Sequence, residues 1–389
     1  MISRDLLGSH WPIRPLGELV EFLDHLRRPV TESDRTVGPY PYYGANGQQG
    51  TISEYIFDEP LILVAEDGGH FDNPDRGIAY RIEGKSWVNN HAHVIRPRPG
   101  CDLGYLCHVL KHYDVTPFVT GTTRGKLTKA GASAIPIPVP PIEEQRRIAA
   151  ILDQAEALRA KRRQALAKLD TLTQSLFLEM FGDSPSPRFP VANIDDAVAP
   201  SRNSIRTGPF GSQLLHSEFV KFGIPVLGID NAVTNRFAWA APRFISEAKY
   251  ESLRRYTVKP GDVLITIMGT CGRAAVVPAD IPKAINTKHL CCITVDAKKY
   301  LPEFIQSCIL MYPDSKRHLL QTSKGAIMSG LNMDLIKSTP IPKPPLELQY
   351  LYRDRMAKIE AMRINCIGAQ GLLDSNVASL QHRAFRGEL

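Results

Sequence analysis

The chain has 389 residues, 43% of them hydrophobic, which is long for one domain, enough for two, and too apolar for a disordered protein. It contains neither an apolar N-terminal segment nor a run of about 18 apolar residues, so we expect a cytoplasmic protein without a secretion signal or membrane span. The net charge of +7 is concentrated in two regions, because residues 76–140 hold 9 Lys/Arg against 3 Asp/Glu and residues 184–344 hold 20 against 12. This distribution suits polyanion contact at two places, although ordinary solubility would also explain the total.

Residues 1–140 are expected to form a first globular domain of the α+β class. Its short apolar runs are separated by Gly, Pro and Asn, a pattern that favours strands. The expected elements are strands at residues 60–64 and 78–82 and a helix near 105–112. Glycine-rich loops such as Gly44–Gly47 and Gly121–Lys126 either let the backbone approach a ligand closely or form plain turns.

Two groups of residues in this domain have the composition of a metal site. Asp75, Glu83 and Lys85 imitate a P-D…E-x-K pattern, so the alternative function is a metal-dependent nuclease that uses these three side chains. Their spacing is short for that site. His91 and His93 alternate on an expected strand and are either metal ligands or, more commonly, a satisfied polar pair. The seven cysteines include no C-x-x-C pair, so they indicate reduced thiols rather than a zinc finger.

A proline-rich strip then leads into a long helix. Residues 135–145 read I-P-I-P-V-P-P-I-E-E-Q, which predicts an extended segment because proline cannot donate to a ladder. Pro141 suits the first position of a helix, and Glu143 falls in its first turn, where a carboxylate meets the positive end of the helix dipole. Since neither proline nor glycine follows before Phe181, we expect a spacer helix over residues 141–183, a rod of roughly 60 Å.

The second half of the chain repeats this plan. Residues 339–349 read T-P-I-P-K-P-P-L-E-L-Q, at an offset of 339 − 135 = 204 from the first strip. We therefore expect a second globular domain over residues 184–344 and a second spacer helix over residues 345–389. The expected elements of the second domain are strands at 224–227, 262–267 and 274–277 and a helix near 303–310.

Each long helix carries an apolar stripe with heptad spacing. The first stripe consists of Ile148, Ile151, Ala155, Leu158, Arg162, Ala165, Leu169, Leu172 and Leu176. Adding 204 gives Tyr352, Arg355, Ile359, Met362, Cys366, Ala369, Leu373, Asn376 and Leu380. The spacing predicts that the two helices pair in a coiled coil, and the chain order favours an antiparallel pair. A helix lying on a membrane surface is the alternative, but charges of both signs on the other faces argue against it.

The motif P-x-P-P-[IL]-E-x-Q at Pro138–Gln145 and Pro342–Gln349, together with the loop Tyr42–Gly47, resembles the specificity subunit of Type I restriction–modification systems. The resemblance implies two target-recognition domains that read a bipartite site in double-stranded DNA and are separated by an antiparallel coiled coil. It implies partnership with modification subunits, which carry S-adenosylmethionine, and with a restriction subunit that translocates and cuts. This chain would bind no cofactor and would not be an enzyme itself, and it lacks the N-P-P-Y-like loop of an amino methyltransferase.

The resemblance also assigns candidate residues by position. The loops at residues 121–126 and 323–331 would approach DNA, and the starts of the long helices would dock the modification subunits. The candidates for DNA contact are Asn46, Arg124, Lys126, Arg273, Lys324, Ser329 and Asn332, and those for partner contact are Gln145, Arg146, Gln349 and Arg353. Solvated loop charges are the alternative for the cationic members. Trp87 and Trp239 are expected to be core residues.

Overall fold

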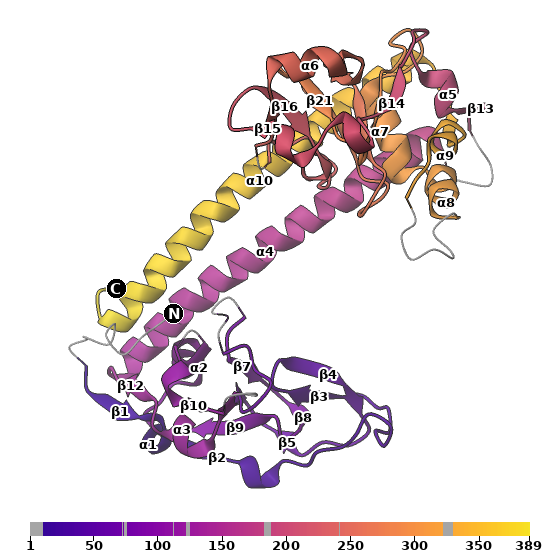
Figure 1. Ribbon diagram of the computed structural model, residues 1–389. Helices are drawn as coiled ribbons and strands as arrows, with labels where there is room; N and C mark the ends of the chain where they lie inside the picture. Colours follow the sequence, from indigo (N-terminus) through magenta and orange to yellow (C-terminus); the bar gives the residue numbers. More distant parts are fainter. Residues whose placement is uncertain are drawn as a thin grey trace. The chain divides into compact units, whose positions relative to one another are not determined.

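The chain divides into two compact units (Figure 1). The first unit comprises Met1–Gln164 with Ile367–Leu389, and the second unit is Ala165–Cys366. The computed structural model describes residues 11–71, 73, 76–111, 113–121, 125–182, 188–240, 242–321 and 330–389. Both units mix helices with sheets, as an α+β sequence predicts.

In its described part, the first unit holds two four-stranded sheets and two short strand pairs. One sheet has the order β2 (Val20–Phe22), β9 (Ala92–Pro97), β6 (Leu61–Ala65) and β7 (Ala79–Ile82). The other has the order β4 (Gly47–Ile52), β3 (Tyr40–Gly44), β8 (Lys85–Val88) and β5 (Phe57–Asp58). The pairs are β1 (Ile13–Pro15) with β12 (Pro136–Pro138) and β10 (Val119–Thr120) with β11 (Lys126–Leu127). The α-helices are α1 (Leu16–Leu19), α2 (Leu103–Lys111) and α3 (Lys129–Ser133), and η2 (Asp24–Leu26) and η3 (Thr116–Phe118) are 3-10 turns.

The second unit, over its described residues, holds one four-stranded sheet, one five-stranded sheet and one strand pair. The first has the order β14 (Ile205–Thr207), β22 (Leu290–Ile293), β19 (Val263–Thr266) and β20 (Ala274–Val276). The second has the order β15 (Phe219–Val220), β17 (Phe244–Ile245), β16 (Ile224–Leu227), β21 (Ala284–Asn286) and β18 (Thr257–Val258). The pair is β13 (Val191–Asn193) with β23 (Pro340–Pro342). The α-helices are α5 (Ile194–Ala197), α6 (Glu247–Leu253), α7 (Pro302–Met311), α8 (Pro313–Gln321) and α9 (Met333–Lys337).

The central strands follow from continuous apolar runs. All five residues of β6 are buried between β7 and β9, and all four residues of β19 are buried between β20 and β22. A strand with both faces covered needs such a run, and each fully buried Leu or Ile contributes about 1.5–3 kcal/mol. The five strands and two helices that the sequence predicts are all present, with ends shifted by a residue or two.

The proline-rich strips form the same structure in both units. Strand β1 pairs with β12 so that Arg14 lies opposite Ile137, and β13 pairs with β23 so that Ala192 lies opposite Ile341. Ile137 and Ile341 are separated by 204 residues, the offset of the sequence repeat. Each strip is extended and leads at once into a long helix, which confirms this part of the sequence prediction.

The two long helices are α4 (Ile142–Phe181) and α10 (Leu346–Arg386). In the first unit, Arg159 of α4 pairs with Asp374 of α10 at 2.6 Å. In the second unit, Asp170 of α4 pairs with Arg363 of α10. Because the later residue of α4 meets the earlier residue of α10, the helices are antiparallel. Within the described residues, none of the helices combines the length and apolar character that crossing a bilayer requires.

The apolar stripe on these helices is only partly buried. Ile148 and Tyr352, near the helix starts, are fully buried because the globular part of their own unit packs around them. Leu158, Leu172 and Met362 are instead 45%, 48% and 56% exposed. A continuous buried seam is therefore not formed, since two helices alone cover only one side of such a residue.

Helix α4 is attached to the first unit by a polar contact that includes one buried histidine. Asp153 of α4 accepts hydrogen bonds from Arg81 of β7 at 2.5 Å and from Nε2 of His108 of α2 at 2.7 Å. Nδ1 of His108 is buried and finds no hydrogen-bond partner among the described residues. Burial lowers the pKa of His108 below its ordinary value of 6.5, despite the opposing effect of Asp153.

This lowered pKa predicts a loss of stability in mild acid. The unfolded chain binds a proton at His108 more readily than the folded chain does. The stability that goes with a neutral His108 is therefore fully present above pH 6.5 and is lost as the pH falls below it. As the pH is lowered from about 7.5 to about 5.5, we expect the melting temperature of the wild type to fall more steeply than that of His108→Gln. Thermal melts at a series of pH values measure this, and equal slopes would contradict it.

Candidate nucleic-acid interface

Four segments of the first unit meet where β3 and β6 end and β9 begins. The backbone N–H of Asn89 donates to Tyr43 O at 3.0 Å, and that of Glu66 donates to His91 O at 2.9 Å. The carbonyl of Glu66 in turn accepts from the N–H of Leu127 at 2.7 Å. We call residues 44–47, 66–69, 89–91 and 126–127 the first corner.

The second unit contains the same set of backbone hydrogen bonds. Thr287 N donates to Leu227 O at 2.8 Å, and Ile267 N donates to His289 O at 2.9 Å. The carbonyl of Ile267 accepts from the N–H of Leu331 at 2.9 Å. We call residues 228–231, 267–269, 287–289 and 330–331 the second corner. The matched bonds align the two corners position by position. Equivalent positions are Asn46 and Asp230, Glu66 and Ile267, His91 and His289, His93 and Cys291, and Lys126 and Gly330.

The first corner brings together two residues that the sequence assigns to DNA contact. The side chain of Asn46 is exposed and donates to Gly68 O at 2.9 Å. The side chain of Lys126 is 49% exposed, and its ammonium lies 3.0 Å from a carboxylate oxygen of Glu66. Both therefore border the 66–69 segment and present polar groups to solvent. Arg124 lies outside the described residues.

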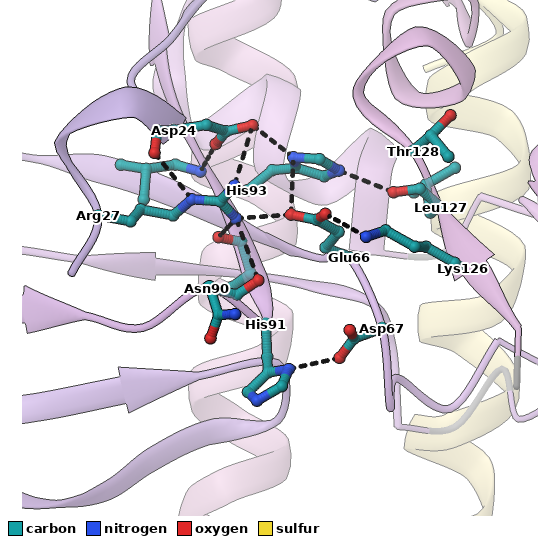
Figure 2. A network of polar contacts seen from close by, with 12 residues as sticks. Asp24, Arg27, Glu66, Asp67, Asn90, His91, His93, Lys126, Leu127 and Thr128 are labelled. Carbon is teal, nitrogen blue, oxygen red and sulfur yellow. Dashed lines mark hydrogen bonds and ion pairs between the residues drawn. The ribbon is translucent and has the colours of Figure 1, made fainter. Parts of the chain in front are cut away.

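Beneath the first corner lies a network of charged side chains centred on His93 (Figure 2). His93 is 1% exposed, and its Nδ1 lies 2.7 Å from Asp24 while its Nε2 lies 2.8 Å from Leu127 O. Since both ring nitrogens face acceptors, both carry protons, and the ring is a buried cation that fixes β11 to the sheet. Burial alone would raise the pKa of Asp24, but the hydrogen bond and charge of His93 outweigh it and lower that pKa.

Glu66 is the second acid of the network. Its carboxylate accepts from Arg27 at 2.6 Å and from Lys126 at 3.0 Å, and it lies 3.7 Å from His93. Burial raises the pKa of Glu66, but the hydrogen bonds from Arg27 and Lys126 and the charge of His93 lower it overall. Both acids are thus held as carboxylates.

The ligand atoms of Asp24, Glu66 and His93 lie within 4.8 Å of one another, which is close enough for a metal ion. Arg27 and Lys126, however, already neutralise the carboxylates, and both nitrogens of His93 are engaged. His91 pairs with a different carboxylate, because its Nδ1 lies 2.5 Å from Asp67. The geometry therefore favours ion pairs over a metal site, in line with the polar-pair interpretation of the two histidines.

The second corner replaces this network with apolar packing. Ile267 is 4% exposed and Cys291 is fully buried, with its Sγ 3.8 Å from Sδ of Met333. The charged groups lie instead at the surface, where Arg243 pairs with Asp230, the counterpart of Asn46. The shared fold therefore does not require the buried ions of the first unit.

Basic side chains surround His289 in the second corner. Its neighbour Lys288 is exposed, and Arg243 lies close enough to affect its charge state. Burial lowers the pKa of His289 below 6.5, and the charges of Lys288 and Arg243 lower it further. At neutral pH the ring is therefore uncharged and able to donate and accept hydrogen bonds beside two cations.

The remaining DNA-contact candidates differ in their surroundings. Arg273 is exposed and, with Leu331, lines a cavity of about 370 Å³ beside the second corner. Asn332 is exposed, but its side chain accepts from Leu335 N at 2.8 Å and caps α9. Lys324 and Ser329 lie outside the described residues.

The two motif glutamines have a structural role instead of the predicted partner contact. Gln145 is 1% exposed, and its amide bonds Asp102 N at 2.8 Å and the carbonyl of Pro140 at 2.9 Å. Gln349 is fully buried and makes the equivalent bonds to Leu301 N and the Pro344 carbonyl, at 2.9 and 3.1 Å. Each glutamine ties a long helix to its own unit, which corrects the expectation that these side chains face a partner.

The two motif arginines do face solvent. Arg146 pairs with Glu143 one turn earlier, and both side chains are more than half exposed. Arg353 pairs with Asp354 at 3.0 Å, and its guanidinium lies 4.9 Å from the ring centre of Tyr350. The geometry leaves both arginines accessible within the first eight residues of α4 and α10.

Comparison with known proteins shows which family the chain resembles. Residues 8–168 match the Type I restriction modification DNA specificity domain. A Haemophilus influenzae protein named as a type I restriction enzyme specificity subunit is 29% identical over 93% of this chain and 90% of its own length. The chain is therefore similar to Type I specificity subunits over nearly its whole length. The MjaVIII specificity subunit of Methanocaldococcus jannaschii is 22% identical over 90% of this chain and 86% of its own.

The fold is that of solved specificity subunits. The S subunit of M. genitalium superposes with a TM-score of 0.60, covering 97% of this chain and 96% of its own, at 14% identity. A chain from a study of complex assembly and conformational transition in the type I R-M system gives a TM-score of 0.56 at 16% identity, covering 97% and 98%. Both likenesses support the expected fold of two globular domains with long helices.

The similarity to specificity subunits gives the nuclease alternative no support. Glu83 is exposed in the turn between β7 and β8, where Gly84 has a φ of +67°. The ammonium of Lys85 lies 4.7 Å from the ring centre of Tyr55, so it makes a cation–π contact. Asp75 lies outside the described residues.

Sequence reasoning missed exposed side chains at and beside the second corner. Trp87 is 7% exposed, as predicted for a core residue, but Trp239 is 58% exposed, so the prediction for it is wrong. Arg243 and Lys288 were not among the candidates. The weak similarity of N-N-H-A-H at residues 89–93 to T-K-H-L-C at 287–291, which aligns the two corners, would have pointed to Lys288.

Proposed function

We propose that the chain recognises a bipartite sequence in double-stranded DNA, with one half-site read at each corner, and directs the other subunits of a Type I restriction–modification complex to it. The main observation behind this proposal is that the same backbone arrangement occurs in both units but bears different polar side chains. The first corner offers Asn46, His91 and Lys126, whereas the second offers Lys288 and borders Arg243, which pairs with Asp230. Amide, imidazole and guanidinium groups contact base edges, and ammonium groups contact phosphates.

The chain acts as the recognition component in this proposal and has no catalytic site of its own. Methylation belongs to modification subunits, which bind S-adenosylmethionine, and cutting belongs to a restriction subunit. Arg146 and Arg353 are accessible near the starts of α4 and α10, which supports these helix starts as docking sites for the modification subunits. The proposal places the complex in the cytoplasm, with the DNA.

Methylome mapping tests this function. The gene is deleted from its native strain, and methylated adenines are mapped by long-read sequencing in the wild type, the deletion and a complemented strain. We expect one gapped motif to lose methylation in the deletion and to regain it on complementation. Deletion without loss of any motif, or loss of an ungapped motif, would contradict the proposal.

A further inference from the structure

The network beneath the first corner has an unequal number of charges. Its cations are Arg27, His93 and Lys126, and its anions are Asp24 and Glu66. The side chains of four of them are at most 13% exposed, whereas that of Lys126 is 49% exposed. The surplus positive charge therefore lies on Lys126, the member of this network that reaches solvent, and Figure 2 shows its ammonium beside Glu66.

Lys126 is also the one member whose departure leaves the network neutral. Without it, Arg27 still bonds Glu66 at 2.6 Å, and His93 still bonds Asp24 at 2.7 Å. Two cations then balance two anions, so no unpaired charge is left buried, which would otherwise cost several kcal/mol. The backbone of β11 stays fixed meanwhile, because Leu127 bonds both Glu66 and His93 through its main chain.

We propose that Glu66 is a specificity-determining residue of the first corner, which holds the Lys126 ammonium away from phosphates until correctly docked DNA takes its place. This inference rests on the proposed function. A loosely bound duplex must compete with a carboxylate 3.0 Å from the ammonium, whereas base contacts at the corner bring a backbone phosphate within reach. Glu66 thereby weakens non-specific binding, which arises from phosphate contacts, more than it weakens binding to the recognised sequence.

The second corner shows that the acid is not needed for the fold. Ile267 occupies the position of Glu66, and Gly330 occupies that of Lys126, so acid and cation are replaced together.

The first test replaces Lys126 with Met in the complex assembled with its modification subunits. Binding is measured over a salt series on the motif duplex found by methylome mapping and on a scrambled duplex. We expect the slope of log K against log salt to fall by about one on the motif duplex and to stay unchanged on the scrambled one. Equal falls on both duplexes would overturn the inference, since Lys126 would then contact phosphate in either complex.

The second test is a double-mutant cycle. Glu66→Gln frees Lys126, so affinity for the scrambled duplex should rise about threefold to tenfold and its salt slope should steepen by about one. Adding Lys126→Met should abolish both gains. Glu54→Gln, which removes an exposed carboxylate of the same unit, is the control for net charge and should change little.

The outcomes separate the two proposals. A wild-type complex that binds both duplexes equally contradicts the proposed function itself. If the wild-type complex discriminates between the two duplexes, two results overturn only the role of Glu66. One is a folded Glu66→Gln variant whose salt slope on the scrambled duplex is unchanged. The other is a gain in affinity that persists when Lys126→Met is added. The Lys126→Met test stands even where Glu66→Gln lowers the melting temperature, because Lys126 lies at the surface.

Discussion

Replacing Arg206 with Met is expected to lower the free energy of unfolding of the second unit by about 3–5 kcal/mol. Arg206 is 8% exposed and Asp262 is 1% exposed, and their side chains meet at 2.7 Å. The guanidinium also bonds Thr257 O at 2.6 Å. Met fills a similar volume without a charge, so the carboxylate of Asp262 stays buried with hydrogen bonds but without a cation.

Chemical denaturation of the intact chain, followed by probes in each unit, measures this effect. Arg202→Met is the matched control, because Arg202 is exposed a few residues earlier in the same unit and should change stability by less than about 0.5 kcal/mol. A loss for Arg206→Met no larger than that of the control would show that the pair is not buried as described.

Phe181→Ala is expected to cost a similar amount, about 3–5 kcal/mol, by opening a cavity where α4 enters the second unit. Phe181 is 1% exposed, and its ring centre lies 4.8 Å from that of Phe304, 5.2 Å from that of Tyr352 and 5.3 Å from that of Phe177. One cluster thus joins α4, α7 and α10, so its loss should weaken all three attachments together.

Leu172→Ala provides the comparison on the same helix. Leu172 is 48% exposed, so removing its side chain opens no enclosed cavity and should cost about 1 kcal/mol or less. Thermal melts of both variants measure the difference. Equal losses would mean that the end of α4 is not part of the core of the second unit.

The parts of the fold that local rules determine were predictable from the sequence. Pro141 and Pro345 mark the ends of extended strips, and the long glycine- and proline-free stretch after Pro141 predicts a helix over residues 141–183, close to the observed α4. The repeat at an offset of 204 placed α10 and the matching strips, because both copies obey the same local preferences.

The polar chemistry of the corners was not predictable, because it joins residues that are distant in sequence. His93 meets Asp24 across 69 residues and Leu127 across 34, and no spacing rule links them. Gln145 was misassigned for a related reason. Its place in the first turn of a helix is compatible with solvent or with the core, and only the position of Asp102 decides that it is buried.

The central claim is that each corner reads its own half of the DNA site. The most direct measurement is the methylated motif in strains that carry Asn46→Ala or Lys288→Ala, with Lys298→Ala, an exposed lysine of the second unit, as the control. We predict that Asn46→Ala relaxes base preference in one half of the motif only, that Lys288→Ala affects the other half only, and that the gap keeps its length. Changes in both halves from a single variant, or an unaltered motif in both folded variants, would contradict the claim.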